Sequence, residues 1–128
     1  MRVLLDTCTL IWAVHSPSTL SGTARKVIAD QNNIVLVLAA SAWEIATKVR
    51  NGRLPVAAQL EQDFVAILGR ASFEQLPISI EDALRAGRIT STHKDPFDRM
   101  IAAQAISLDI PVISPDEQLD SFAIQRLW

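Results

Sequence analysis

The chain has 128 residues, 49% of them hydrophobic and 20% charged, with a formal net charge of −2. This length suits one domain, expected to span residues 1–128, and the weak charge excludes a broadly basic surface, so any nucleic-acid site must be local. Cys8 is the only cysteine, which excludes an intramolecular disulfide, and no apolar stretch reaches the roughly 20 residues that span a membrane.

The first half of the chain alternates between two hydrophobic patterns. Arg2–Leu5 is an apolar run typical of a buried strand, and residues 10–14 carry apolar side chains at helical spacing. A polar residue soon interrupts the N-terminal run, so we expect no signal peptide and a cytoplasmic protein. A helix with a serine cap is expected over Ser21–Asp30. Ile34–Leu38 has the continuous apolar character of a parallel strand, and Ser41 then opens a helix that ends at Asn51-Gly52.

The same alternation continues in the second half. A long helix is expected over Val56–Arg70, a strand over Phe73–Ile78 and a helix over Glu81–Arg88. Asp95-Pro96 opens a strongly apolar helix through Ser107, since aspartate is a favoured helix cap and proline a favoured first residue. Two short strands complete the pattern, at Pro111–Ser114 and Ala123–Leu127.

This order of elements is typical of an α/β fold, in which a mostly parallel sheet has helices on both faces. In such sheets, sites form just outside the carboxyl ends of the strands. Asp6 and Asp116 directly follow two expected strands, and Glu44 lies one turn into the helix after another. The pattern therefore places acids from distant parts of the chain at one edge of the sheet.

Each acid also has a structural explanation. Asp6 can cap the next helix, and Asp116 fits a turn. Ser41 and Glu44 match a capping box, in which the glutamate reaches back to the start of the helix. Asp98 suits the first turn of its helix, where an acid interacts favourably with the helix dipole. The argument for a site rests on the clustering of the acids and not on any single one.

Four clustered carboxylates repel one another and require a cation, and oxygen ligands suit Mg²⁺ or Mn²⁺. His15, His93 and Cys8 do not have the spacing of a zinc site. The sequence also lacks a Gly-x-Ser-x-Gly elbow, a P-loop and a dinucleotide fingerprint. Trp12 and Trp43 are expected to pack in the core rather than to stack on bases.

Four motifs occur in order along the chain: LLDTCTLIW, SAWEIATKVRNGRL, HKDPFDRMIAAQA and VISPDEQL. Together they resemble the PIN-domain ribonucleases, and more closely the toxin subunits of VapBC-type toxin–antitoxin pairs. The resemblance extends from Arg2 to Trp128. It implies a PIN-like three-layer fold with strand order 3-2-1-4-5, dependence on Mg²⁺ or Mn²⁺, and endonucleolytic cleavage of RNA. It also implies a homodimer and a cognate antitoxin that blocks the site.

Carried over by position, the resemblance implies that four acids bind the metal and act in catalysis: Asp6, Glu44, Asp98 and Asp116. Thr7 and Ser114 match hydroxyl residues that support such a site. Asp95 does not fit the family's frame, so we interpret it as a cap or a supporting acid. RNA also needs cationic contacts. Five residues near the acids in sequence are candidates, although each can equally be a solvated surface charge: Lys48, Arg50, Arg53, Lys94 and Arg99.

The main alternative function is a PIN-like module that binds RNA or protein without cleaving it. Metal-dependent cleavage of RNA distinguishes the two. A phosphoryl-accepting receiver domain needs paired acids after its first strand, and a hydrolase with a D-x-D signature needs an acid two residues after Asp6. Thr7 and Cys8 stand at these positions and argue against both classes.

Overall fold

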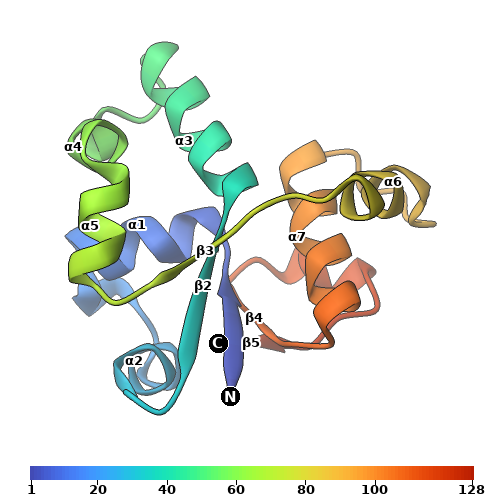
Figure 1. The fold of residues 1–128 in the computed structure, drawn as a ribbon, viewed down its shortest axis with the longest axis horizontal. Helices are drawn as coiled ribbons and strands as arrows, with labels where there is room; N and C mark the ends of the chain where they lie inside the picture. Colours follow the sequence, from blue (N-terminus) through green and yellow to red (C-terminus); the bar gives the residue numbers. More distant parts are fainter.

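Five parallel strands form one sheet at the centre of the molecule. In the computed structural model, which describes residues 1–128, the strand order is β3-β2-β1-β4-β5 (Figure 1). The strands are β1 (Arg2–Leu5), β2 (Ile34–Leu38), β3 (Glu74–Leu76), β4 (Val112–Ile113) and β5 (Arg126–Leu127). Central β1 pairs Leu4 with Leu36 of β2 and with Val112 of β4. The expected α/β class and strand order are confirmed.

Helices cover both faces of this sheet. They are α1 (Thr7–His15), α2 (Gly22–Ala29), α3 (Ala39–Arg50), α4 (Ala58–Gln62), α5 (Phe64–Arg70), α6 (Ile80–Arg88) and α7 (Pro96–Leu108). Short 3₁₀ turns lie at Pro17–Thr19, Pro55–Ala57 and Glu117–Ser121. In Figure 1, α1, α2, α4 and α5 lie to one side of the sheet, and α6 and α7 lie to the other. None of the helices has the length and hydropathy that a membrane crossing needs.

The central strand is buried from both sides. Val3 and Leu5 belong to one hydrophobic core, which contains residues of α1, α3, α4 and α5. Leu4 faces the other way and joins a second core with Ile101 of α7. Successive side chains of a strand point to opposite faces, so a continuous apolar run serves both cores. This burial fixes the carboxyl end of β1, where Asp6 follows.

Two of the expected helices differ from those observed. Helix α3 begins at Ala39, directly after β2, and Ser41 therefore does not open it. The helix expected over residues 56–70 consists of α4 and α5, separated by Asp63 with φ −112° and ψ 31°. Aspartate has a low helix propensity, which makes this position a suitable break. Strands β3, β4 and β5 are also shorter than the apolar runs that indicated them.

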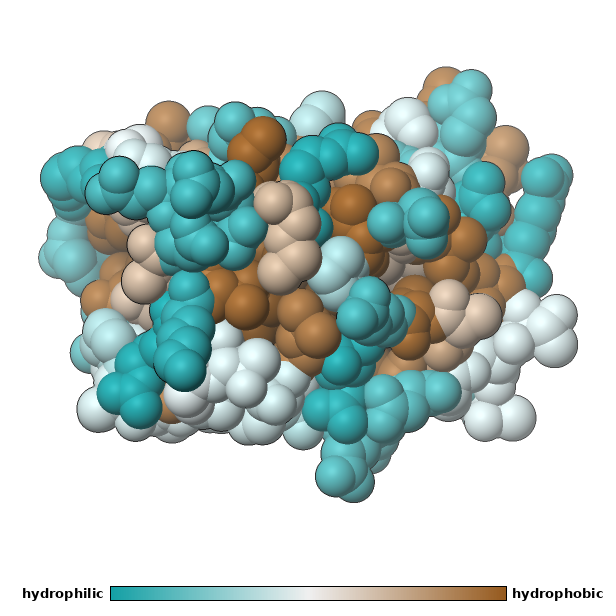
Figure 2. All heavy atoms as spheres, turned by 90° about the horizontal axis from the view of Figure 1, so that it is seen from below, coloured by the Kyte–Doolittle hydropathy of each residue, from teal (hydrophilic) through white to brown (hydrophobic).

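Large aromatic and aliphatic side chains are not all enclosed. Trp12 packs against Trp128 with ring centroids 5.9 Å apart, next to the core beneath α1. Trp43, by contrast, is 62% exposed and meets Phe97 edge-on at 4.9 Å, so the expectation that it packs in the core is wrong. The reason is its place on α3, whose buried side carries Ile45 instead. Apolar groups also reach the surface among polar ones on the face seen from below in Figure 2.

Candidate active site

Asp6 lies where β1 ends and α1 begins. It is the N-cap of α1, and its Oδ1 accepts a 2.8 Å hydrogen bond from the backbone N–H of Thr9. Its Oδ2 accepts from the hydroxyl of Ser114, and the Cys8 thiol lies 3.4 Å from Oδ1. Only 5% of Asp6 is exposed, and burial raises its pKa despite these donors. Helix capping thus explains the contact of Oδ1 only. It does not explain why an ionisable side chain is buried at the end of the central strand.

Ser114 joins two of the acids across the sheet. Its hydroxyl donates to Asp6 and accepts a 3.0 Å hydrogen bond from the backbone N–H of Asp116. Asp116 follows β4 and caps the next 3₁₀ turn, with its Oδ1 accepting from the N–H of Gln118 at 2.9 Å. Because β1 and β4 are adjacent and parallel, both acids lie at the same edge of the sheet. Ser114 therefore contacts both acids directly.

Glu44 reaches this edge from α3. Its Oε1 accepts a 2.5 Å hydrogen bond from Thr7 Oγ1, and its Oε2 forms an ion pair with Lys48 one turn later. Thr7 Oγ1 also lies 3.1 Å from the hydroxyl of Ser41. Since the helix starts two residues before Ser41, Glu44 stands beyond the first turn, and the capping box that the sequence suggests does not form. The carboxylate of Glu44 is held by other side chains and not by the start of the helix.

Asp98 lies in the first turn of α7, which Asp95 caps. Asp95 Oδ1 accepts from the N–H groups of Phe97 at 2.8 Å and Asp98 at 3.2 Å, so Asp95 is the helix cap that the sequence indicates. The Asp98 side chain takes no part in the cap, and its Oδ2 lies 2.8 Å from Nε2 of His93. Burial, followed by repulsion from Asp95 and Asp116, raises the pKa of Asp98 to about 6.

Arg99 is fully engaged with the main chain. Its guanidinium donates at 2.6–3.4 Å to carbonyl oxygens at the end of α6 and in the following loop, those of Ala86, Gly87, Ile89, Ser91 and His93. A guanidinium has five N–H donors, so none is left for another ligand. The expectation that Arg99 contacts RNA is therefore wrong. Its side chain instead connects α6 and the following loop to α7.

The other candidate cations have different surroundings. Lys48 is paired with Glu44. Arg50 at the end of α3, Arg53 in the loop after it and Lys94 beside the cap of α7 are exposed. These three have no ion-pair partner within the protein, so they can meet an anionic ligand.

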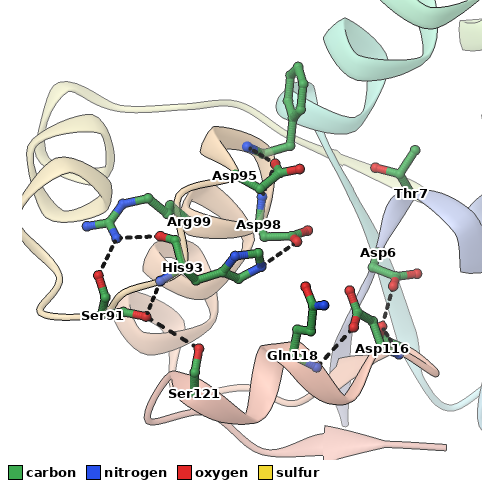
Figure 3. Close-up of polar contacts among 12 residues, drawn as sticks. Asp6, Thr7, Ser91, His93, Asp95, Asp98, Arg99, Asp116, Gln118 and Ser121 are labelled. Atoms are coloured by element: carbon green, nitrogen blue, oxygen red, sulfur yellow. Dashed lines mark hydrogen bonds and ion pairs between the residues drawn. The ribbon is translucent and has the colours of Figure 1, made fainter.

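The carboxylates of Asp98 and Asp116 point toward one space, and Asp6 lies beside it with its carboxylate turned toward Ser114 (Figure 3). Asp98 and Asp116 also interact electrostatically, because Asp116 raises the pKa of Asp98. The Cys8 thiol lies in the same field, and burial together with Asp6 raises its pKa to about 12. Such a set of hard oxygen donors has the chemistry of a Mg²⁺ or Mn²⁺ site.

The arrangement of these acids does not yet enclose an ion. No three side chains among His, Cys, Asp and Glu are close enough together to hold one. Each acid instead has a partner of its own, Ser114 for Asp6, His93 for Asp98 and Thr7 with Lys48 for Glu44. The carboxylate oxygens are thus the type of ligand that a divalent ion prefers, but the acids lie too far apart in this structure to coordinate one together.

His93 is the contact that the sequence did not assign. His93 lies in a loop without hydrophobic periodicity, so the direction of its side chain does not follow from the sequence. The available signal was the motif HKDPFD, in which the histidine stands five residues before Asp98.

The fold and this edge define a class, an α/β protein with a five-stranded parallel sheet and an acid-rich site at the carboxyl ends of its central strands. The family model of the PIN domain matches residues 3–125. The chain belongs to the PIN-domain family. No curated protein matches its sequence.

Several solved structures share the fold at low sequence identity. VapBC2 from Rickettsia felis, bound to a DNA fragment from its promoter, has a TM-score of 0.69 and 12% identity, covering 99% of this chain and 98% of that chain. VapBC-1 from nontypeable Haemophilus influenzae has a TM-score of 0.67 and 19% identity, covering 99% and 97%. VapBC-5 from Mycobacterium tuberculosis, described as a member of a family of toxin–antitoxin systems, has a TM-score of 0.58 and 20% identity, covering 98% of each chain.

Proposed function

We propose that this protein is a metal-dependent endoribonuclease that acts as the toxin of a toxin–antitoxin pair. The observation that carries the proposal is the edge of the sheet at which Asp6, Asp98 and Asp116 gather, with raised pKa values for Asp6 and Asp98. Membership of the PIN-domain family supports the nuclease activity, and the similarity to VapBC structures supports the toxin role. Clustered acids withdrawn from water are unfavourable without a counter-ion, which favours a cation in the working site.

Asp6, Asp98 and Asp116 would hold a Mg²⁺ or Mn²⁺ ion, directly or through water. When bound, the ion supplies positive charge against the scissile phosphate and lowers the pKa of a coordinated water. The protein's part is to fix the oxygens, since Thr9 and Ser114 hold Asp6. Glu44 would be a further ligand or the residue that orients the attacking water. Attack by water at phosphorus leaves a 5′-phosphate and a 3′-hydroxyl.

The RNA would cross this edge of the sheet and contact the exposed cations Arg50, Arg53 and Lys94. Contacts of this kind with phosphates carry much of the affinity for RNA and weaken as salt increases. Replacing one of the three with alanine should lower binding to all RNA sequences and reduce the salt dependence. Arg99 is left out of this path because its donors are engaged.

The test exchanges each acid for its amide. We expect Asp6→Asn, Asp98→Asn and Asp116→Asn each to reduce RNA cleavage and growth arrest by about 10²-fold or more, the usual effect of removing a charged contact from a reacting centre. Asp95→Asn is the matched control on the same helix, since asparagine caps a helix as well as aspartate. Cleavage should stop in excess chelator and return with Mn²⁺.

Several outcomes would contradict this proposal. Cleavage that persists in excess chelator excludes the metal mechanism. An essential Asp95 with a dispensable Asp98 shows that the assignment of the acids is wrong. Binding of RNA without cleavage, in the presence of Mn²⁺, favours the alternative function of a binding module.

We also propose that the chain forms a homodimer and binds a cognate antitoxin in the cytoplasm. Large apolar side chains are exposed over several elements: Met1, Ile34, Trp43, Val56, Val65, Ile78, Ile80 and Leu84. Such groups are available for burial against a partner. An arginine of the antitoxin at the acidic edge would form bidentate hydrogen bonds with the carboxylates. The same contact would block access of RNA to the site and displace the metal ion, and so inhibit cleavage.

This partnership is tested by co-expressing the chain with the product of the adjacent upstream reading frame. RNA cleavage is measured for the purified complex and again after the partner has been removed. We expect activity only in the second case. A complex that cleaves RNA as fast as the free chain contradicts inhibition, and a monomer at micromolar concentration in sedimentation contradicts the homodimer.

A further inference from the structure

His93 is held through its main chain. Its backbone N–H donates to Ser91 Oγ at 3.1 Å, and its carbonyl accepts from Arg99 Nη1 at 3.0 Å. Ser91 in turn lies 3.3 Å from the hydroxyl of Ser121. These contacts fix the loop before α7 at both the amide and the carbonyl of His93 (Figure 3). The loop is therefore anchored without help from the imidazole.

The imidazole itself is directed at one acid. Its Nε2 lies 2.8 Å from Asp98 Oδ2, and the ring rests on Phe122 with centroids 5.5 Å apart. Both side chains are largely enclosed, with 16% of His93 and 22% of Asp98 exposed. With the proton on Nε2, the ring donates to the carboxylate and fixes its orientation. The other carboxylate oxygen, Oδ1, has no hydrogen-bond partner in the protein and is left for a cation.

From this geometry we infer that His93 is a positioning residue, which holds Asp98 through Oδ2 and leaves Oδ1 to bind the divalent ion. The inference rests on the proposed function, because it concerns the ion of that site. Metal-binding carboxylates are themselves hydrogen-bonded in proteins, and loss of such an outer partner lowers metal affinity about 10- to 100-fold. Asp98 has one such partner here, whereas Asp6 has Thr9 and Ser114.

Two substitutions of His93 separate this role from a purely structural one. The amide nitrogen of a glutamine can reach the position of Nε2 and donate to Asp98, whereas that of an asparagine reaches only the position of Nδ1. His93→Gln should therefore keep the contact, and His93→Asn and His93→Ala should lose it. All three variants lose the packing of the imidazole against Phe122. A packing defect would therefore affect all three variants, whereas loss of the contact with Asp98 spares His93→Gln.

The experiment measures Mn²⁺ binding to the RNA-free protein by titration calorimetry at one pH, with thermal midpoints in chelator recorded for every variant. We expect His93→Ala and His93→Asn to weaken Mn²⁺ binding about 10- to 100-fold and His93→Gln by only a few-fold. In an Asp98→Ala background, His93→Ala should have no further effect, since the two residues act through one contact.

The outcomes distinguish this inference from the proposed function. Wild-type affinity in His93→Ala overturns the positioning role and leaves the metal site intact. Equal weakening in all three variants, in step with their thermal midpoints, also overturns it and makes His93 a packing residue. A wild-type protein that binds no Mn²⁺ overturns both the inference and the metal-dependent function.

Discussion

Asp98 carries its charge close to two other acids and is partly withdrawn from water. Burial, and then repulsion from Asp95 and Asp116, raises its pKa from 3.8 to about 6, although the contact with His93 lowers it. The folded protein therefore favours the protonated form of Asp98 more than the unfolded chain does. In the absence of a cation, this charge opposes folding at neutral pH.

We expect Asp98→Asn to stabilise the metal-free protein at pH 7.5. Asp98 does not oppose folding below the unfolded pKa of 3.8, where it is protonated in both the folded and the unfolded protein. This advantage is lost as pH rises through the folded pKa of about 6, because the folded protein must then carry the unfavourable charge. One pKa unit corresponds to about 1.4 kcal/mol, and solvent screening reduces the expected gain to about 1 kcal/mol in total. Thermal midpoints in excess chelator should rise by about 3 °C at pH 7.5, and this gain should shrink as pH falls from 6 towards 4.

Glu61→Gln is a suitable control for this measurement, because Glu61 is an exposed acid far along the chain from the site acids. It should change the midpoint little at any pH. A lower midpoint for Asp98→Asn at pH 7.5 would mean that the carboxylate is stabilising in the empty site and that its neighbours act as counter-charges.

Single residues show where sequence patterns stop being informative. The positions of Asp6 and Asp116 were predictable, because each follows an apolar strand and parallel strands end at one edge. The contacts of the carboxylates were not, because they depend on rotamers and on loops without periodicity. His93 and the pairing of Glu44 with Lys48 belong to this second kind.

Among the elements, α6 depends on α7 at both of its ends. Arg99 of α7 donates to carbonyl groups at the end of α6 and beyond it. Near the start of α6, the buried Gln104 of α7 donates to Pro77 O at 2.9 Å and to Asp82 at 3.1 Å. Two side chains of one helix thus hold another helix that has exposed apolar residues of its own, Ile80 and Leu84.

We expect Arg99→Ala to lower the free energy of unfolding by about 2–4 kcal/mol. Hydrogen bonds from a charged donor contribute about 1.5–3 kcal/mol each, and the freed carbonyls recover part of this with water. Arg99→Lys should restore little, since an ammonium cannot span the five carbonyls. Urea unfolding gives the magnitude, and hydrogen exchange should become faster in residues 80–93. The exposed neighbour Lys94→Ala should stay within about 0.5 kcal/mol of wild type.

The elements also show which parts of the fold the sequence could predict. The order of strands and helices followed from apolar periodicity, and the strand order followed from the resemblance to PIN domains. The break at Asp63 did not show, because Leu60, Phe64 and Leu68 have the spacing of one continuous helix. The start of α3 was misplaced because Ser41 looks like a cap, whereas its hydroxyl meets Thr7 inside the protein.

For the molecule as a whole, the proposed metal site predicts that ion binding and the stability of the fold are coupled. An ion that binds only the folded protein stabilises it by about 2.7 kcal/mol at a hundred times its dissociation constant. We therefore expect Mn²⁺ to raise the thermal midpoint of the wild type and to raise that of Asp6→Asn much less. Asparagine keeps the cap of α1, so the comparison isolates the charge. Equal shifts in the two proteins would place the ion elsewhere.

The hydrogen bond between Asp6 and Ser114 joins residues 108 positions apart. Asp6 is made long before Ser114 and Asp116, because translation runs from the N-terminal side. Domains fold during synthesis from the N-terminal side, at about 5–20 residues per second, so most of the core can form while the site is still incomplete. In the proposed nuclease, the two halves of the site therefore come together only after the long intervening segment has been made and the sheet that joins them has formed.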